Sequence, residues 1–98
     1  MMGRLIDCYK AVEDSSQKML EAAKAEDWDT VVRYEGACAV LIEQLRTQAR
    51  HEELTPEQRR EKALIMQRIL RNDACIRYLA EPWLARLEEP WGKQPVLH

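Results

Sequence analysis

Ala37-Cys38-Ala39-Val40-Leu41-Ile42 is a run of six apolar residues inside a segment whose flanks mix apolar and charged residues at helical spacing. Successive residues of an α-helix are about 100° apart, so such a run surrounds the whole helix. A single core-facing stripe cannot cover it. The remaining apolar surface needs a second helix of the same chain, another copy of the chain, or a helix of a client protein.

The segments around this run are predicted to be helices as well. Asp27 is a suitable N-cap residue for a helix over about 28–50. Upstream, apolar residues recur at steps of three and four, which predicts a helix over about 5–24. Downstream, Thr55-Pro56-Glu57-Gln58 has the pattern of a capping box with proline at the first helical position, so a third helix should begin at 56.

Pro82 decides where the third helix ends, because a proline ring clashes with the preceding helical turn. It should end the helix near residue 80 or kink it, and it can open a short fourth helix over 82–88. Residues 89–98 lack both period and caps and are predicted to be a flexible tail. The sequence therefore predicts an all-α fold: an antiparallel three-helix bundle with a short fourth C-terminal helix, in one domain over 1–88.

Composition bounds the class of protein. The 98 residues are 46% hydrophobic and 33% charged, with a net charge of -2, which is typical of one globular domain. No apolar window is long enough to cross a membrane, and no secretory signal follows the first methionine. The three cysteines, Cys8, Cys38 and Cys75, form no C-x-x-C pair and are expected to be reduced. The predicted location is the cytoplasm.

Residues suited to catalysis or metal binding are sparse. His51 lies near a predicted helix end and His98 at the last position, with no ligands close to either in sequence. The acidic pairs 52–53 and 88–89 fall in a loop and the tail, where solvated carboxylates are expected. We therefore expect no enzymatic activity, no metal and no cofactor.

Three features have two interpretations each. Gly36, inside a predicted helix, either admits a neighbouring backbone or is a tolerated surface glycine. Asp73 either faces a groove or pairs at the surface with Arg77, four residues later. The basic stretch 55–77 could contact DNA or another acidic partner, but it lacks interleaved aromatic residues, which favours a solvated or ion-paired helix face, including ion pairs with the acidic residues 1–30.

The order and spacing of several motifs resemble the FliT family of flagellar type III export chaperones over residues 5–87. The motifs are Asp27-Trp28-Asp29, Leu41-Ile42-x-x-Leu45, Leu54-Thr55-Pro56-Glu57 and Ile69-Leu70-x-x-Asp73-x-x-Ile76-x-x-Leu79-x-x-Pro82-Trp83-Leu84. The resemblance implies a helical chaperone that binds the C-terminal segment of the filament-cap protein FliD, prevents its premature assembly and delivers it to the export apparatus and its ATPase. In some members the family also binds the master regulator FlhDC.

The first hypothesis is therefore an apolar groove between the helices at 28–50 and 56–80, supported by the first helix, that receives an amphipathic client helix. The residues expected to contact the client are Leu41, Ile42, Leu45, Met66, Ile69, Leu70, Asp73 and Ile76. Trp83, Leu84 and Leu87 are expected to form a competing lid. The alternatives are a dimerisation or adaptor module, in which a second copy covers the surface, and a regulator that binds a transcription factor of the FlhDC type. Neither direct nucleic-acid binding nor membrane insertion is expected.

Overall fold

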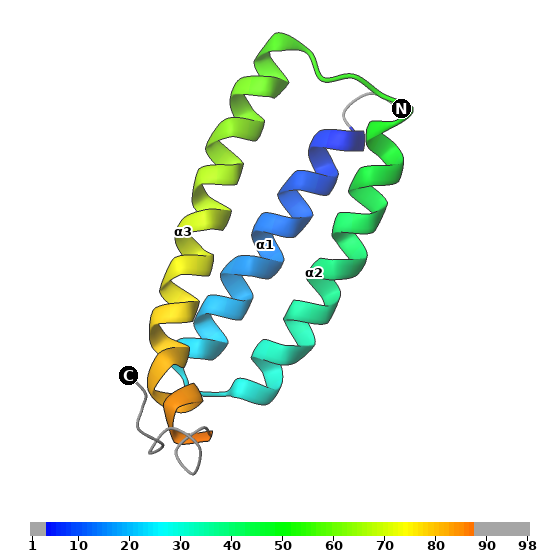
Figure 1. Cartoon of the computed structure of the whole chain (residues 1–98). Coiled ribbons are helices and arrows are strands. Elements are labelled where there is room, and N and C mark those ends of the chain that lie inside the picture. Colours follow the sequence, from blue (N-terminus) through cyan, green and yellow to red (C-terminus); the bar gives the residue numbers. More distant parts are fainter. Residues whose placement is uncertain (1–3, 88–98) are drawn as a thin grey trace, which may run out of the picture.

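The structure, a computed structural model, describes the backbone of residues 4–87 and the side chains of residues 4–82. It contains three helices that run in alternating directions: α1 (Arg4–Lys24), α2 (Trp28–Ala49) and α3 (Pro56–Leu87) (Figure 1). The described residues form no strand. The predicted all-α class and the starts of all three helices are confirmed.

The predicted caps of α2 and α3 are formed. The backbone N–H of Thr30 donates to Oδ1 of Asp27 at 3.3 Å, and the Thr30 hydroxyl donates to Oδ2 at 2.6 Å. At the start of α3, the Gln58 N–H donates to the Thr55 hydroxyl at 3.1 Å, and the Thr55 N–H donates to Oε1 of Gln58 at 2.9 Å. This reciprocal pair is a capping box, so it fixes where α3 begins.

Hydrogen bonds from Thr30 hold the pKa of Asp27 below its usual value, because they favour the carboxylate form. A carboxyl group with a lowered pKa in the folded state adds stability above its unfolded pKa. That contribution is lost as the pH falls through the folded pKa. The start of α2 is therefore best supported at neutral pH.

The turn between α1 and α2 closes without glycine. Glu26 adopts a left-handed conformation with φ of 59°. The Asp27 N–H donates to the Ala22 carbonyl at 2.9 Å, and the Glu26 N–H donates to the Ala23 carbonyl at 3.0 Å. These bonds form a Schellman motif, which ends α1 and reverses the chain into α2.

Glu52, in the loop between α2 and α3, is not the solvated carboxylate that the sequence suggested. It is half-buried, and its Oε1 accepts from the backbone N–H of Leu5 at 3.1 Å and from Nε2 of Gln48 at 3.0 Å. A carboxylate at a helix N-terminus satisfies a free amide and interacts well with the helix dipole. Glu52 therefore joins the α2–α3 loop to the start of α1.

Replacing Glu52 by alanine should lower the free energy of unfolding by about 1 kcal/mol, since the Leu5 amide loses its charged acceptor. Urea unfolding followed by circular dichroism measures this change. Glu53→Ala is the matched control, because Glu53 is exposed and makes none of these bonds. Equal stability of the two variants would contradict the capping role of Glu52.

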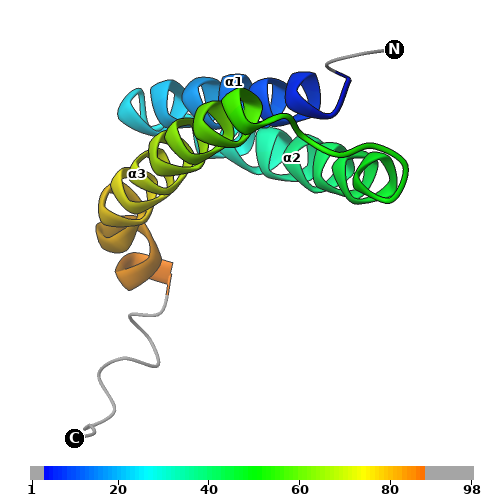
Figure 2. The same cartoon turned by 90° about the horizontal axis from the view of Figure 1, so that it is seen from above.

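The separate fourth helix expected over 82–88 is not confirmed, and the third helix does not end near residue 80. α3 continues through Pro82 to Leu87. Proline removes one helical hydrogen bond and crowds the carbonyl four residues earlier, but a helix can absorb both by bending. The last turns of α3 turn away from the line of the preceding ones (Figures 1 and 2), which agrees with the predicted kink. The predicted tail, 89–98, and Glu88 lie outside the described residues.

Helix α1 packs against both other helices, whereas α2 and α3 barely touch each other. Figure 2 shows α1 on one side, with α2 and α3 diverging below it. The buried apolar side chains accordingly come from α1 and α3 and none comes from α2: Leu5, Ile6, Val12, Leu20, Ala23, Ile65 and Ile76. The side opposite α1, between α2 and α3, is left open.

Polar contacts set how α3 lies on α1. Nδ2 of Asn72 donates to the hydroxyl of Ser16 at 3.0 Å, and both residues are buried. Salt bridges join Lys10 to Glu61 at 3.2 Å and Arg68 to Glu13 at 3.4 Å. The Arg68–Glu13 pair joins the basic stretch 55–77 to an acidic residue of α1, as the ion-pair interpretation expected, whereas in the Lys10–Glu61 pair the basic residue belongs to α1.

Candidate binding groove

An apolar groove runs along the open side, with α2 and α3 as its walls. It consists of three recesses of about 330, 360 and 430 Å³ that share lining residues. The first lies near Leu45 and Met66, and the last lies near Trp28 and Ala80. Because 17 residues separate Trp28 from Leu45 along α2, the groove is about 25 Å long.

The groove walls expose large apolar side chains to solvent. Leu70 of α3 is 61% exposed and Ile42 of α2 is 40% exposed, and both line the central recess. Val32, at the far end of the groove, is also exposed. None of the 22 residues of α2 is buried. The run at 37–42 is therefore covered only in part by the described chain.

The structure brings seven of the eight predicted contact residues to this groove: Ile42, Leu45, Met66, Ile69, Leu70, Asp73 and Ile76. The eighth, Leu41, is half-buried and lines none of the three recesses. Ile76 is only 8% exposed, so it belongs to the groove floor more than to its walls. The backbone of the predicted lid residues Trp83, Leu84 and Leu87 lies in the last turns of α3.

Sequence reasoning missed the floor of the groove, which comes from α1: Tyr9, Val12, Ser16 and Met19. The sequence shows these residues at helical spacing, which predicts that they lie on the buried face of α1. It does not predict that part of this face also lines a groove. Glu35, Cys38 and Ala39 of α2 were missed as well. Cys38 and Ala39 belong to the apolar run 37–42, so the run could have identified them as groove residues.

Charged groups lie at defined places along the groove. Nζ of Lys62 lies 5.4 Å from the centroid of the Tyr9 ring, at the end near Leu45. Nε of Arg77 lies 3.0 Å from Oδ2 of Asp73, near the other end. Both interpretations of Asp73 therefore hold together, since it lines the groove and pairs with Arg77.

The thiol of Cys38, on the α2 wall of the central recess, has a raised pKa. The main cause is burial, and the negative charge of Glu35 adds to it. A raised pKa keeps the thiol protonated and unreactive at neutral pH. Cys38 therefore acts as a small apolar residue in the groove.

Gly36 is exposed, and a Cβ atom built there would meet nothing within 4 Å. The interpretation that a neighbouring segment of this chain approaches Gly36 is therefore wrong for the described residues, and Gly36 is a surface glycine in a helix.

Gly36→Ala should raise the free energy of unfolding by about 0.5–1 kcal/mol, because alanine loses less backbone entropy in a helix and has room here. Thermal or urea unfolding measures the gain. Ala37→Gly, at the adjacent exposed position, should lose a similar amount. A destabilised Gly36→Ala variant would show that the site is not open.

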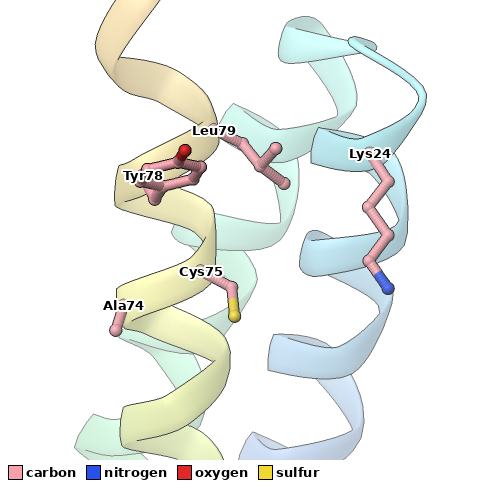
Figure 3. Close-up of a pocket in the computed structure, with 5 residues that line it drawn as sticks. All are labelled: Lys24, Ala74, Cys75, Tyr78 and Leu79. Carbon is pink, nitrogen blue, oxygen red and sulfur yellow. The ribbon is translucent and has the colours of Figure 1, made fainter.

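A further apolar recess of about 370 Å³ lies away from the groove, between the end of α1 and α3 (Figure 3). Lys24 comes from α1, and the other lining residues come from α3: Ala74, Cys75, Tyr78 and Leu79. It shares no residue with the three recesses of the groove.

Within residues 4–87, no group of three or more His, Cys, Asp or Glu side chains is placed to hold a metal ion. In the same part of the chain, no helix has both the length and the apolar character that a membrane span needs.

Comparison with known proteins agrees with the fold and with the motifs. The family model described as flagellar protein FliT matches residues 6–91. The crystal structure of the flagellar protein FliT from Bordetella bronchiseptica is similar, with 35% sequence identity, a TM-score of 0.75, and coverage of 87% of this chain and 96% of that chain. A comparison with curated proteins finds no match. The length of the family match and the similarity of the solved structure show that this chain belongs to the FliT family of flagellar proteins.

Proposed function

We propose that this protein is a cytoplasmic flagellar export chaperone whose groove between α2 and α3 binds the C-terminal helical segment of the filament-cap protein FliD. The observation that supports the proposal most is the exposure of Ile42, Met66 and Leu70 along one continuous groove. Contiguous exposed apolar surface on a small protein is typical of an interaction site.

The dimensions of the groove favour a helix as the client. A helix of about 17 residues spans 25 Å and presents apolar residues at steps of three and four, which suits a groove with helical walls. Burying apolar surface contributes about 25 cal/mol per Å², less the cost of ordering the client. We expect a dissociation constant in the micromolar range or tighter.

Calorimetric titration of the protein with the C-terminal segment of FliD from the same organism tests this function. Saturable one-to-one binding with a negative heat-capacity change is expected, because apolar surface is buried. Absence of binding at concentrations up to about 1 mM would overturn the proposal. A tight dimer that persists on dilution in light scattering and ignores the FliD segment would favour the dimerisation module.

Sequestration of this segment would keep FliD from assembling before export. The loaded chaperone would then pass FliD to the export ATPase and the export gate. Binding of FlhDC would couple export to transcription. Family membership supports the proposal of these steps, and co-purification of each partner with the loaded and the free chaperone tests them.

The residues after Pro82 are proposed to compete with the client for the groove. Since α3 is continuous to Leu87, such a lid would require the helix to break at Pro82. Tighter FliD binding after deletion from Pro82 onward would support a lid. Loss of binding in a still-folded protein would instead make the segment part of the site.

A further inference from the structure

We propose that the groove selects the direction of its client helix by charge. The preferred client carries a basic residue opposite Glu35 and an acidic residue about eleven positions later opposite Lys62, so it runs parallel to α2. This inference rests on the proposed function, because it concerns the occupant of the same groove.

The end of the groove near Leu45 is positively charged. Lys62 lines the recess there, and its ammonium group is held over the Tyr9 ring at 5.4 Å from the ring centroid. Arg59 lies three residues earlier on α3, on the same side of the helix, and is exposed. A carboxylate on a client would therefore be attracted to this end.

The other half of the groove carries a negative charge from Glu35, which lines two of the three recesses. Asp73 lines the same two recesses, but its charge is offset by Arg77 in the 3.0 Å ion pair. Glu35 lies three residues before Cys38 on α2, and its negative charge contributes, after burial, to the raised pKa of this thiol in the central recess. A basic client residue would be attracted to this half.

The spacing of the two charges fits the period of a helix. On α2, Glu35 is ten residues from Leu45, which lies beside Lys62, and on α3, Lys62 is eleven residues from Asp73. Each count corresponds to about 15 Å along a helix axis. About eleven residues of a client helix cover this distance in three turns, so the two complementary residues lie on the same face.

The helix dipole favours one direction over the other. The amino end of a helix is partially positive and the carboxyl end partially negative. A client whose amino end lies at Glu35 and whose carboxyl end lies at Lys62 therefore matches both charges. This direction is parallel to α2 and antiparallel to α3 (Figure 1).

Two synthetic 18-residue peptides of identical composition test the proposal. Both carry a Leu and Ala stripe at helical spacing. The first has Lys near its amino end and Glu eleven positions later, and the second has these two residues exchanged. Fluorescence anisotropy in about 50 mM salt should give roughly five- to ten-fold tighter binding of the first peptide. The preference should fade in about 0.5 M salt because the rim charges are screened.

The double variant Glu35→Lys with Lys62→Glu should invert the preference. Arg71→Glu is the control, because Arg71 is exposed on α3 and lines none of the recesses, so it should keep the wild-type preference. Equal affinity for both peptides, or no binding of either while the FliD segment binds, would overturn charge selection and leave the groove function intact. Failure of the FliD segment as well would overturn the proposed function itself.

Discussion

Leu70→Glu is expected to weaken binding of the FliD segment by about 100-fold or more, while the protein stays folded. Leu70 is 61% exposed in the central recess, so a glutamate there remains solvated in the free protein. In the complex the same carboxylate would be buried against an apolar helix without a partner. The cost of such burial exceeds the roughly 3 kcal/mol that corresponds to 100-fold in affinity.

Leu64→Glu is the matched control for this experiment. Leu64 also lies on α3 and is 52% exposed, but it lines none of the recesses of the groove. Calorimetry should give wild-type affinity for this variant, and circular dichroism should give the same helix content for both. If Leu70→Glu binds as tightly as the wild type, the client does not occupy the central recess. Equal losses in both variants would indicate a general effect of the added charge.

Exposure decides which groove residues can be tested in this way. Ile76 and Ile69 were both predicted to contact the client. Because Ile76 is almost fully buried, a charge there would disrupt the contact between α3 and α1 as well as the groove. Loss of binding would then have two explanations. Substitutions at the exposed Leu70 and Ile42 avoid this ambiguity, because they change the groove walls and leave the buried core intact.

The helices were predictable from the sequence because their signals are local. Asp27 and Thr55 bond to amides only three residues away, so their capping roles can be read from the sequence without knowing the fold. The contact of Glu52 with Leu5 joins residues 47 positions apart and follows from the way α2 returns beside α1. No local pattern distinguishes such a carboxylate from its solvated neighbour Glu53.

The groove was predictable only in part for a related reason. Periodicity places Ile42, Leu45 and Ile69 on apolar faces, and those faces line the groove. Periodicity does not reveal which of the three helices contacts both of the others. The identity of that helix determines which face of each helix is buried. Since α1 takes this position, Val12 forms the floor and Leu41 lies outside the recesses. Whether Pro82 ends α3 or only bends it depends on how much bending the rest of the helix tolerates. The presence of a proline does not determine this.

Ile65→Ala is expected to lower the free energy of unfolding by about 3 kcal/mol. Ile65 is 1% exposed and is the largest fully buried side chain described. Truncation would leave a cavity where α3 packs on α1. In a domain of this size the loss corresponds to a fall in Tm on the order of 10–20 °C.

Leu64→Ala, one residue away and exposed, should change stability by less than about 0.5 kcal/mol. Comparable losses in both variants would mean that α3 turns a different face to α1.

The same variant links stability to binding. Because α1 forms the floor of the groove and α3 one wall, the groove exists only while these two helices remain packed. A client that binds only the folded state stabilises it by about 2.7 kcal/mol when present at 100 times its dissociation constant. Excess FliD segment should therefore restore most of the Tm that Ile65→Ala loses, as measured by differential scanning fluorimetry. Leu70→Glu combined with Ile65→Ala should show little recovery at the same client concentration, because the client binds about 100-fold more weakly. Recovery in that double variant would place the stabilising contact outside the groove.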